Sequence, residues 1–221
     1  MLKNADCKKI LLTGFEPFGG YSENSSWEVA QRVASCGVEG VDVEVVAVQL
    51  PVSFARVGEV LRSAIELHTP DLVIMLGQTT ATDCVRLERV ALNMMDSRKA
   101  DNDGYIADEE PIYEGEESAL FTSLPIKRLR SAIEVQGIAA KISNSAGLYV
   151  CNRTYYEALR LCKERAMQAI FVHLPLCEGQ TSSQPDKKSM PLGDMCRAVQ
   201  TIIEETNDKN RTIQEAVSES L

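Results

Sequence analysis

DLVIML, residues 71–76, is the stretch of sequence that decides the fold. A short and continuous apolar run of this kind is typical of a parallel β-strand that helices cover on both faces. The segment before it, from Pro51 to about His68, carries apolar residues at helical spacing and stops at Thr69-Pro70, because the residue before a proline avoids helical geometry. A helix that leads directly into a buried strand predicts an α/β fold.

The same alternation of strands and helices continues on both sides of this run. Further strands are predicted at Lys9–Thr13, Val41–Leu50, Arg86–Met94, Ile138–Ile142 and Met167–Pro175, and further helices at Trp27–Ser35 (capped by Ser25 or Ser26), Pro125–Val135, Leu148–Glu164 and Leu192–Thr206. Alternating elements favour right-handed βαβ crossovers, so we predict one domain, residues 1–221, with a mostly parallel central sheet.

Two segments stand apart from this alternation. Residues 96–117 are polar and acidic, and we predict that they leave the sheet as a long excursion with a small hairpin around Gly104 and Gly115. The acidic residues 207–221 are expected to extend the last helix or to fray.

The composition argues against several classes of protein. A formal net charge of -9 over 221 residues argues against nucleic-acid binding, which needs a basic surface. The longest apolar runs, such as Leu72–Leu76 and Ala169–Val172, are far shorter than the ~20 residues of a membrane span. Met1–Lys9 is polar and is not followed by the apolar core of a signal peptide. We therefore expect a soluble, cytoplasmic protein with neither nucleic acid nor a membrane as its partner.

The seven cysteines form no recognisable framework. No two of them make a Cys-x-x-Cys pair, and none has zinc-finger spacing with a histidine. A cytoplasmic setting disfavours disulfides, so most of these thiols are expected to be small core residues and only one or two to be reactive. We expect neither a metal nor another cofactor.

In an open α/β sheet, chemistry is expected beyond the carboxyl ends of the strands, and these lie after Thr13, Leu76, Ile142 and Val172. The loop after Ile142 leads into a helix whose first turns hold Cys151, where the helix dipole favours a thiolate and free N–H groups can bind an oxyanion. His173 ends an apolar strand. Together the two residues are the minimum needed for thiolate attack on an amide, although each alone also fits an ordinary buried residue.

A third residue should orient the imidazole. Glu88, beside Arg89, follows the strand end at Gln78, but by spacing alone Asp83 and Asp96 are also available. A carboxylate between two arginines fits a structural ion pair equally well, so the residues alone leave this choice open.

Four segments, taken in order, make the sequence similar to the pyroglutamyl peptidase (pyrrolidone carboxylate peptidase) family of cysteine peptidases. They are Thr13–Gly20 with Asn24 and Trp27, Gly77-Gln78 with Glu88–Asn93, Ser143–Gly147 with Cys151-Asn152, and Val172–Pro175. The similarity spans roughly residues 9 to 206. It implies a single-domain three-layer α/β/α sandwich, with Cys151 as nucleophile, His173 as acid/base and Glu88 as the orienting carboxylate.

The resemblance also implies a pocket for the pyroglutamyl ring. Phe15 and Phe18 resemble the aromatic wall of that pocket, Asn24 and Gln78 match polar positions near it, and Val150 lies beside the nucleophile. Arg89 matches a basic residue that supports the oxyanion or Glu88. Pyroglutamate is a flat, uncharged lactam, which suits aromatic faces and a few aimed hydrogen-bonding groups. Without the loop context, Phe15 and Phe18 would fit ordinary core packing.

One segment departs from the family. After Gly77-Gln78 the family usually carries small residues, often glycines, and then an arginine, whereas this chain has TTATD at 79–83. That loop borders the substrate, so the departure predicts an altered pocket or leaving-group preference rather than another reaction.

Three other readings remain to be tested against the peptidase hypothesis. The chain is alternatively a catalytically impaired homologue that binds pyroglutamyl peptide ends. A nucleotide-binding α/β protein would need a glycine-rich phosphate loop, and neither usual fingerprint follows a strand. A zinc site could use His173 and Cys177, but no further ligands lie nearby in the sequence. Family resemblance also implies a homo-oligomer, a tetramer or a dimer, with pyroglutamyl peptides as substrates.

Overall fold

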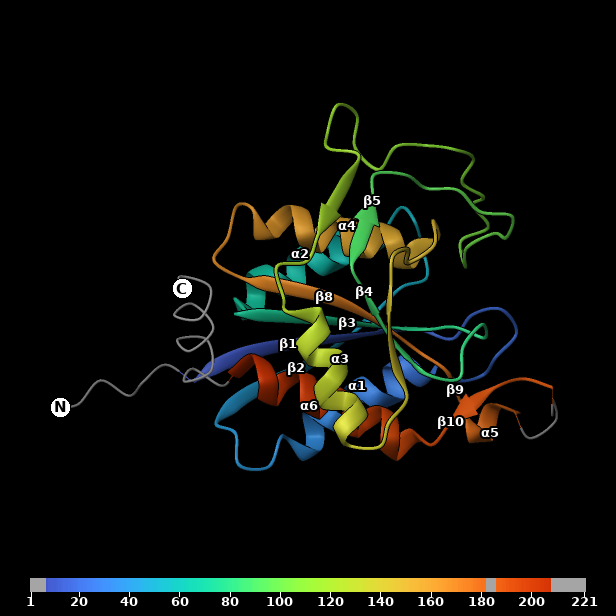
Figure 1. The fold of residues 1–221 in the computed structure, drawn as a ribbon. Helices are drawn as coiled ribbons and strands as arrows, with labels where there is room; N and C mark the ends of the chain where they lie inside the picture. The colour runs from blue at the N-terminus through green and yellow to red at the C-terminus, as the bar shows by residue number, and fades with distance from the viewer. Residues whose placement is uncertain (1–6, 182–185, 208–221) are drawn as a thin grey trace.

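A six-stranded sheet with the order β2-β1-β3-β8-β4-β7 forms the centre of the molecule (Figure 1). The computed structural model describes residues 7–181 and 186–207. The strands of this sheet are β1 (Lys8–Phe15), β2 (Val43–Leu50), β3 (Leu72–Gln78), β4 (Val85–Glu88), β7 (Ala140–Ser143) and β8 (Gln168–Leu174). Every residue of β3 is buried, as its continuous apolar sequence predicts.

The sheet is mostly parallel, but two of its strands run the other way. Strands β2, β1, β3 and β8 are parallel to one another, whereas β4 pairs with β8 antiparallel and with β7 parallel. The connection from β3 to β4, residues 79–84, is too short for a parallel return, which needs a dozen or more residues. Strand β4 therefore runs antiparallel to β3, and β8 lies between the two.

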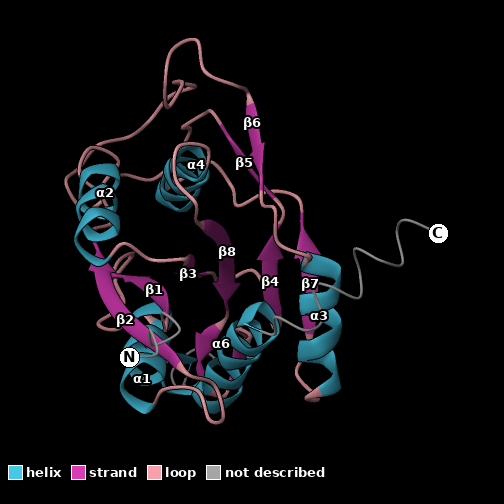
Figure 2. Ribbon diagram, turned by 90° about the vertical axis from the view of Figure 1, so that its left-hand side faces the viewer, coloured by secondary structure: helices cyan, strands magenta, loops and turns pink. Residues whose placement is uncertain are grey.

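Helices cover both faces of the sheet and make three layers (Figure 2). The helices are α1 (Ser25–Cys36), α2 (Val57–His68), α3 (Ile126–Val135), α4 (Val150–Cys162) and α6 (Leu192–Asn207). One apolar core packs α1, α3 and α6 against the sheet, and a second packs α2 and α4 against the other face. The expected α/β/α sandwich is confirmed.

A small second sheet projects from the α2 and α4 side (Figure 1). The predicted strand at Arg86–Met94 divides after Glu88, and its second half is β5 (Val90–Leu92), which pairs antiparallel with β6 (Ala119–Phe121). The excursion at 96–117 joins these two strands. A hairpin around Gly104 and Gly115 is not formed, because the pairing there is limited to one bridge between Met95 and Glu110.

Several boundaries also differ from the prediction. Asn24, rather than Ser25 or Ser26, caps α1, and its side chain accepts a hydrogen bond from the Ser26 N–H. The second helix starts at Val57 rather than at Pro51. Four short elements were not predicted, namely β6, β9 (Leu176–Cys177), α5 (Glu178–Thr181) and β10 (Ser189–Met190).

Two further expectations concern the whole chain. Apart from Asn207, which ends α6, the residues 207–221 lie outside the described part of the structure. None of the helices in the described part is long and apolar enough to span a bilayer.

Candidate active site

Strand β8 carries His173 next to its carboxyl end, where the side chain is only 6% exposed. Gly77 of β3 lies directly opposite His173 in the parallel register. A Cβ atom at position 77 would lie 2.7 Å from the Phe171 ring and 3.1 Å from the His173 ring. Glycine is therefore required at this position, because the two rings pack over the backbone of the neighbouring strand.

Glu88 approaches His173 from the other side, on β4. The antiparallel register sets Arg86 opposite His173 and Glu88 opposite Phe171. Glu88 thus lies one diagonal step from the histidine, within reach of its side chain. The Glu88 Oε1 atom is 2.8 Å from Nδ1 of His173, and the glutamate is fully buried.

The other two candidate carboxylates lie elsewhere. Asp83 is exposed and pairs with Lys188 at 2.7 Å. Asp96 is also exposed, and its backbone N–H donates to the Leu148 carbonyl. Among the three carboxylates that the sequence left open, Glu88 is the one that contacts the imidazole.

Cys151 lies in the first turn of α4 and is half-buried. The N-cap residue is Tyr149, whose side chain does not cap the helix. The first N–H groups of a helix have no partner within the helix, and the positive end of its dipole favours an anion. The start of α4 therefore suits both a thiolate at position 151 and an oxyanion beside it.

The path to Cys151 differs from the prediction in one respect. Because β7 runs against β8, the loop at 144–149 does not begin at the carboxyl edge of the parallel strands. It starts at the outer strand of the sheet and passes β4 to bring Cys151 to His173 on β8.

The charge state of His173 reflects its neighbours. Burial by itself lowers the pKa of His173, but hydrogen bonding to Cys151 and to Glu88 outweighs it and raises that pKa from 6.5 to about 9. The imidazole is therefore protonated at neutral pH, between a thiol on one side and a carboxylate on the other. This is the arrangement that favours a thiolate–imidazolium pair.

Asn152 fixes the start of α4 to the small sheet. Its side chain is fully buried, accepts from the Leu92 N–H at 2.9 Å, and donates to the carbonyls of Leu92 and Met94 at 2.9 and 2.8 Å. The sequence did not single out this role, although Asn152 stands in the motif Cys151-Asn152. The position of the nucleophile thus depends on the small sheet of β5 and β6.

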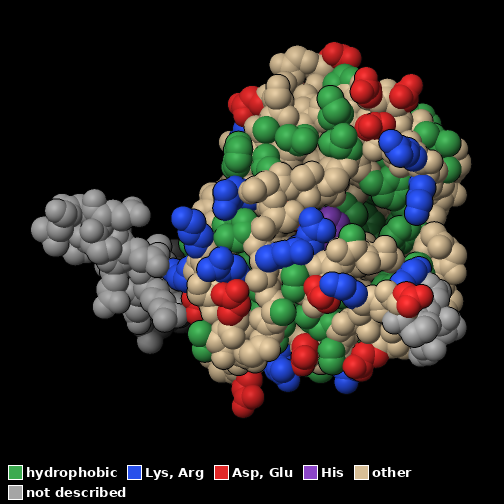
Figure 3. Space-filling view, turned by 45° about the vertical axis from the view of Figure 1, so that its right-hand side comes forward, with side chains coloured by type: hydrophobic (Ala, Val, Ile, Leu, Met, Phe, Trp, Pro, Cys, Tyr) green, Lys and Arg blue, Asp and Glu red, His purple; other side chains and the backbone are tan. Residues whose placement is uncertain are grey.

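Aromatic rings connect the end of β1 and the loop after it to His173. Phe15 is buried, its ring centroid is 6.4 Å from that of Phe171, and the centroids of Phe171 and His173 are 4.8 Å apart. Phe18 is half-buried and packs against the same core cluster. Figure 3 shows a hollow on this side of the molecule, with a histidine visible inside it and hydrophobic side chains along its border.

The two predicted polar residues play different parts. Asn24 uses its amide to donate to the Glu16 carbonyl and to accept from Ser26, so it shapes the aromatic loop. Gln78 accepts from the Ser25 N–H and from Gln180, which holds its carbonyl oxygen in place. Its Nε2 is buried and has no partner among the described residues. An amide donor fixed in this way is available to a ligand.

Arg86 also lies beside Glu88, and the predicted support of the oxyanion by Arg89 stays a prediction. The guanidinium of Arg89 makes no ion pair with a described residue, whereas Nε of Arg86 lies 3.8 Å from Oε1 of Glu88. Strand periodicity could have found Arg86, because residues two apart share a face of the sheet. Val150, the last predicted site residue, is buried beside Cys151 at the start of α4.

The remaining thiols and pockets have a different character. Burial raises the pKa of the Cys162 thiol to about 11, and it also raises the pKa values of Cys177 and Cys196. Cys7 and Cys36 are exposed, contrary to the expectation that most thiols are core residues. Across residues 7–181 and 186–207, no group of three or more His, Cys, Asp or Glu side chains is placed to hold a metal ion.

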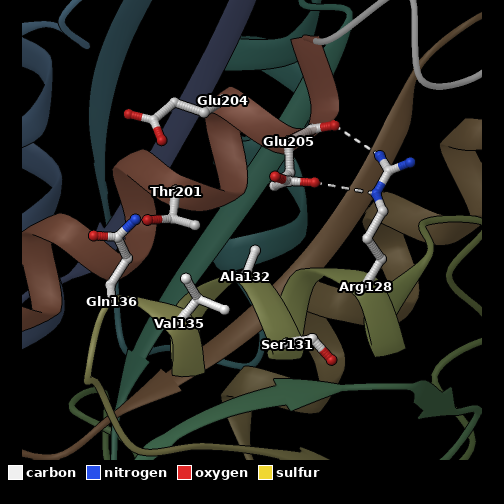
Figure 4. Close-up of a pocket in the computed structure, with 8 residues that line it drawn as sticks. All are labelled: Arg128, Ser131, Ala132, Val135, Gln136, Thr201, Glu204 and Glu205. Atoms are coloured by element: carbon white, nitrogen blue, oxygen red, sulfur yellow. Dashed lines mark hydrogen bonds and ion pairs between the residues drawn. The ribbon is translucent and has the colours of Figure 1, made fainter.

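A second pocket lies on the opposite face of the sheet, between α3 and α6 (Figure 4). Its lining includes Arg128, Thr201, Glu204 and Glu205, and Arg128 pairs with Glu205 across it. It contains neither a histidine nor a cysteine. This pocket therefore offers none of the reactive groups described above.

Comparison with known proteins identifies relatives over most of the chain. The sequence model described as pyroglutamyl peptidase matches residues 8–209. A pyrrolidone-carboxylate peptidase of Thermococcus onnurineus is 42% identical over 197 residues, which cover 88% of this chain and 96% of the relative. One from Vibrio vulnificus is 37% identical and covers 93% and 97%.

Solved structures give the same result. Pyroglutamyl peptidase I from Bacillus amyloliquefaciens superposes with a TM-score of 0.84 at 36% identity, covering 88% of this chain and 92% of that one. The pyrrolidone carboxyl peptidase from Thermococcus litoralis gives a TM-score of 0.83 at 32% identity, with coverages of 89% and 92%.

Proposed function

Because this chain belongs to the pyroglutamyl peptidase family, cysteine peptidases that remove an N-terminal pyroglutamyl residue, we propose that Cys151, His173 and Glu88 perform this reaction. The observation that carries the proposal is the contact series on the α4 face. Glu88 binds Nδ1 of His173 at 2.8 Å, and Cys151 at the start of α4 is among the neighbours that raise the pKa of His173. This arrangement supports the roles of nucleophile for Cys151, acid/base for His173 and orienting carboxylate for Glu88.

In the proposed reaction, the Cys151 thiolate attacks the carbonyl carbon of the pyroglutamyl residue. The negative charge that develops on the carbonyl oxygen is stabilised by N–H groups at the start of α4. Protonated His173 then donates its proton to the leaving amine, the C–N bond breaks, and a thioester remains on Cys151. Water, deprotonated by the now neutral His173, attacks the thioester and releases pyroglutamate. No further reactant is needed.

The same surroundings provide a pocket for the lactam ring. Phe15, Phe18 and Val150 supply apolar surface near Cys151, and the buried Nε2 of Gln78 is a donor for the lactam carbonyl. Proline lacks that carbonyl. A site whose buried donor would then be unpaired is expected to reject a prolyl substrate by about 10⁴-fold or more.

The alternative, a homologue that binds pyroglutamyl ends without cleaving them, draws its only support from the loop at 79–83. There Thr82 is buried and bonds within its own turn to Cys84, while Asp83 is held by Lys188. These contacts leave the Glu88–His173 pair intact. The departure therefore bears on the border of the pocket rather than on the reacting groups.

Hydrolysis of a chromogenic pyroglutamyl amide tests the proposal. Cys151→Ala is expected to abolish product release, while Cys162→Ala, which removes a thiol whose pKa of about 11 keeps it protonated, should retain wild-type kcat. The prolyl amide serves as the substrate control. Full activity in Cys151→Ala would refute the assignment, and binding without cleavage by the wild type would favour the alternative.

The cellular setting and the assembly are also proposals. We place the protein in the cytoplasm as one domain over residues 1–221 that forms a homo-oligomer, either a dimer or a tetramer. Support for an interface comes from Phe121 on β6, which is 64% exposed on a strand paired on one side by β5. Light scattering of the purified chain measures the number of subunits, and a monomer at micromolar concentration would contradict this expectation.

A further inference from the structure

Arg86 lies beside the Glu88–His173 pair and has no role in the reaction as described so far. It precedes Glu88 by two residues on β4, so both side chains leave the same face of the sheet, and it lies directly opposite His173 in the antiparallel register. Its Nε is 3.8 Å from Oε1 of Glu88, and its guanidinium donates to the Ser143 hydroxyl at 3.1 Å. The arginine is thus in contact with the orienting carboxylate and close to the acid/base.

The surroundings of Glu88 explain why such a cation is needed. The carboxylate is fully buried, its Oε1 is shared by His173 and Arg86, and its Oε2 has no partner among the described residues. Burial disfavours the charged form of a carboxyl group, and an isolated buried charge is costly unless it is compensated.

We propose that Arg86 is a positioning residue that acts through Glu88, holding that carboxylate in place against His173. The inference rests on the proposed function. It adds a fourth residue to the machinery, one that never touches the substrate.

Ser143 connects Arg86 to the nucleophile. Ser143 lies opposite Glu88 in the β4–β7 pairing, and its hydroxyl accepts from Arg86 and donates to the Ser145 carbonyl at 3.1 Å. Residue 145 belongs to the loop that leads to Cys151. One hydroxyl therefore holds both the arginine that supports Glu88 and the segment that carries the thiol.

A substrate-binding role for Arg86 makes the opposite kinetic prediction. The side chain is 24% exposed, so it could instead bind a carboxylate of the peptide. An arginine that binds substrate would affect KM, whereas one that positions Glu88 affects kcat. An uncharged pyroglutamyl anilide or coumarin amide removes the first possibility from the measurement.

The test compares Arg86→Gln and Arg86→Lys with Arg130→Gln, a control that removes an arginine 42% exposed and paired with Glu134 on α3. With the uncharged amide, Arg86→Gln is expected to lower kcat by about 10- to 100-fold and to leave KM within about twofold. Residues that orient metal ligands through a hydrogen bond have effects of about this size. Arg86→Lys should recover most of kcat, and Arg130→Gln should equal the wild type. Thermal unfolding of each variant reports whether it is folded.

A double variant makes the test specific. Because Arg86 acts only through Glu88, Glu88→Gln with Arg86→Gln should be no slower than Glu88→Gln alone. Unchanged kcat in Arg86→Gln, a change confined to KM, or fully additive losses in the double variant would each overturn the proposal. A wild-type protein that fails to hydrolyse the amide would instead overturn the proposed function, so the two failures are distinguishable.

Discussion

Two glutamates, Glu88 and Glu157, are both fully buried, and their surroundings differ sharply. Glu157 on α4 accepts from Arg62 and Arg153 at 2.9 Å each, from Tyr113, and lies 3.5 Å from Arg160. Glu88 has one hydrogen bond at Oε1, to His173, and a second oxygen without a partner among the described residues. One carboxylate is saturated with donors and the other is not.

The difference follows from what each residue does. Burial by itself raises the pKa of Glu157, but hydrogen bonds from Tyr113, Arg153 and Arg62 outweigh it and lower that pKa, so the residue is held as a permanent anion. Through Tyr113, Glu157 ties the excursion at 96–117 to α2 and α4. In the proposed reaction, Glu88 responds to a proton that moves between His173 and the substrate. A fully satisfied carboxylate would respond less, so incomplete pairing marks the functional site.

The largest expected effect comes from neutralising the unsaturated carboxylate. Glu88→Gln should lower kcat by about 10³- to 10⁴-fold, because an amide can still hydrogen-bond but cannot stabilise an imidazolium and can hold the wrong tautomer. Steady-state hydrolysis of a pyroglutamyl amide, with unfolding by urea as the control for folding, measures it. A kcat within threefold of wild type would remove Glu88 from the machinery.

Neutralising the saturated carboxylate should act on stability instead. Glu157→Gln leaves three arginines without their counter-charge, and breaking a buried pair of this kind costs about 3 kcal/mol of unfolding free energy. Its matched control is Glu164→Gln, which removes an exposed partner of Arg160 at 3.2 Å and should change stability by less than about 1 kcal/mol. Urea unfolding gives both values, and kcat per folded molecule should stay within about twofold. Equal unfolding free energies of Glu157→Gln and Glu164→Gln would refute the claim that Glu157 stabilises the fold.

The smallest expected effect is on the pH dependence of kcat/KM. His173 must be protonated to donate to the leaving amine, and its pKa is raised to about 9, so kcat/KM should fall as the pH rises through about 9. Glu88→Gln removes one of the interactions that raise the pKa of His173 and should move the limb to lower pH, whereas Glu157→Gln should leave it in place. A wild-type limb near 6.5 would contradict this reading.

The sequence predicted those features of the structure that depend on local patterns of residues. The buried strand at 71–76, Cys151 at the start of a helix and His173 at the end of a strand follow from local patterns, and the structure has all three. The short connection at 79–84 accounts for the reversal of β4, but the position of β8 between β3 and β4 does not follow from any local pattern. That pairing joins residues 83 to 87 positions apart in sequence, beyond the reach of periodicity.

The site shows the same limit. Spacing left Glu88, Asp83 and Asp96 equal, and the strand register brings Glu88 to the histidine. Arg89 stood beside Glu88 in sequence, yet Arg86 stands beside it in space, because successive side chains of a strand point to opposite faces. Asn152 anchors three backbone groups of the hairpin, which only the folded chain reveals.

The most direct test is to capture the covalent intermediate. An activated pyroglutamyl ester acylates a thiolate faster than the thioester is hydrolysed, so acid quenching within the burst should preserve it. Digestion and mass spectrometry should then find one pyroglutamyl group on the peptide that contains Cys151, and none on Cys162 or Cys177. If the burst occurs but the pyroglutamyl group is found on another residue, or on none, nucleophilic attack by Cys151 is contradicted.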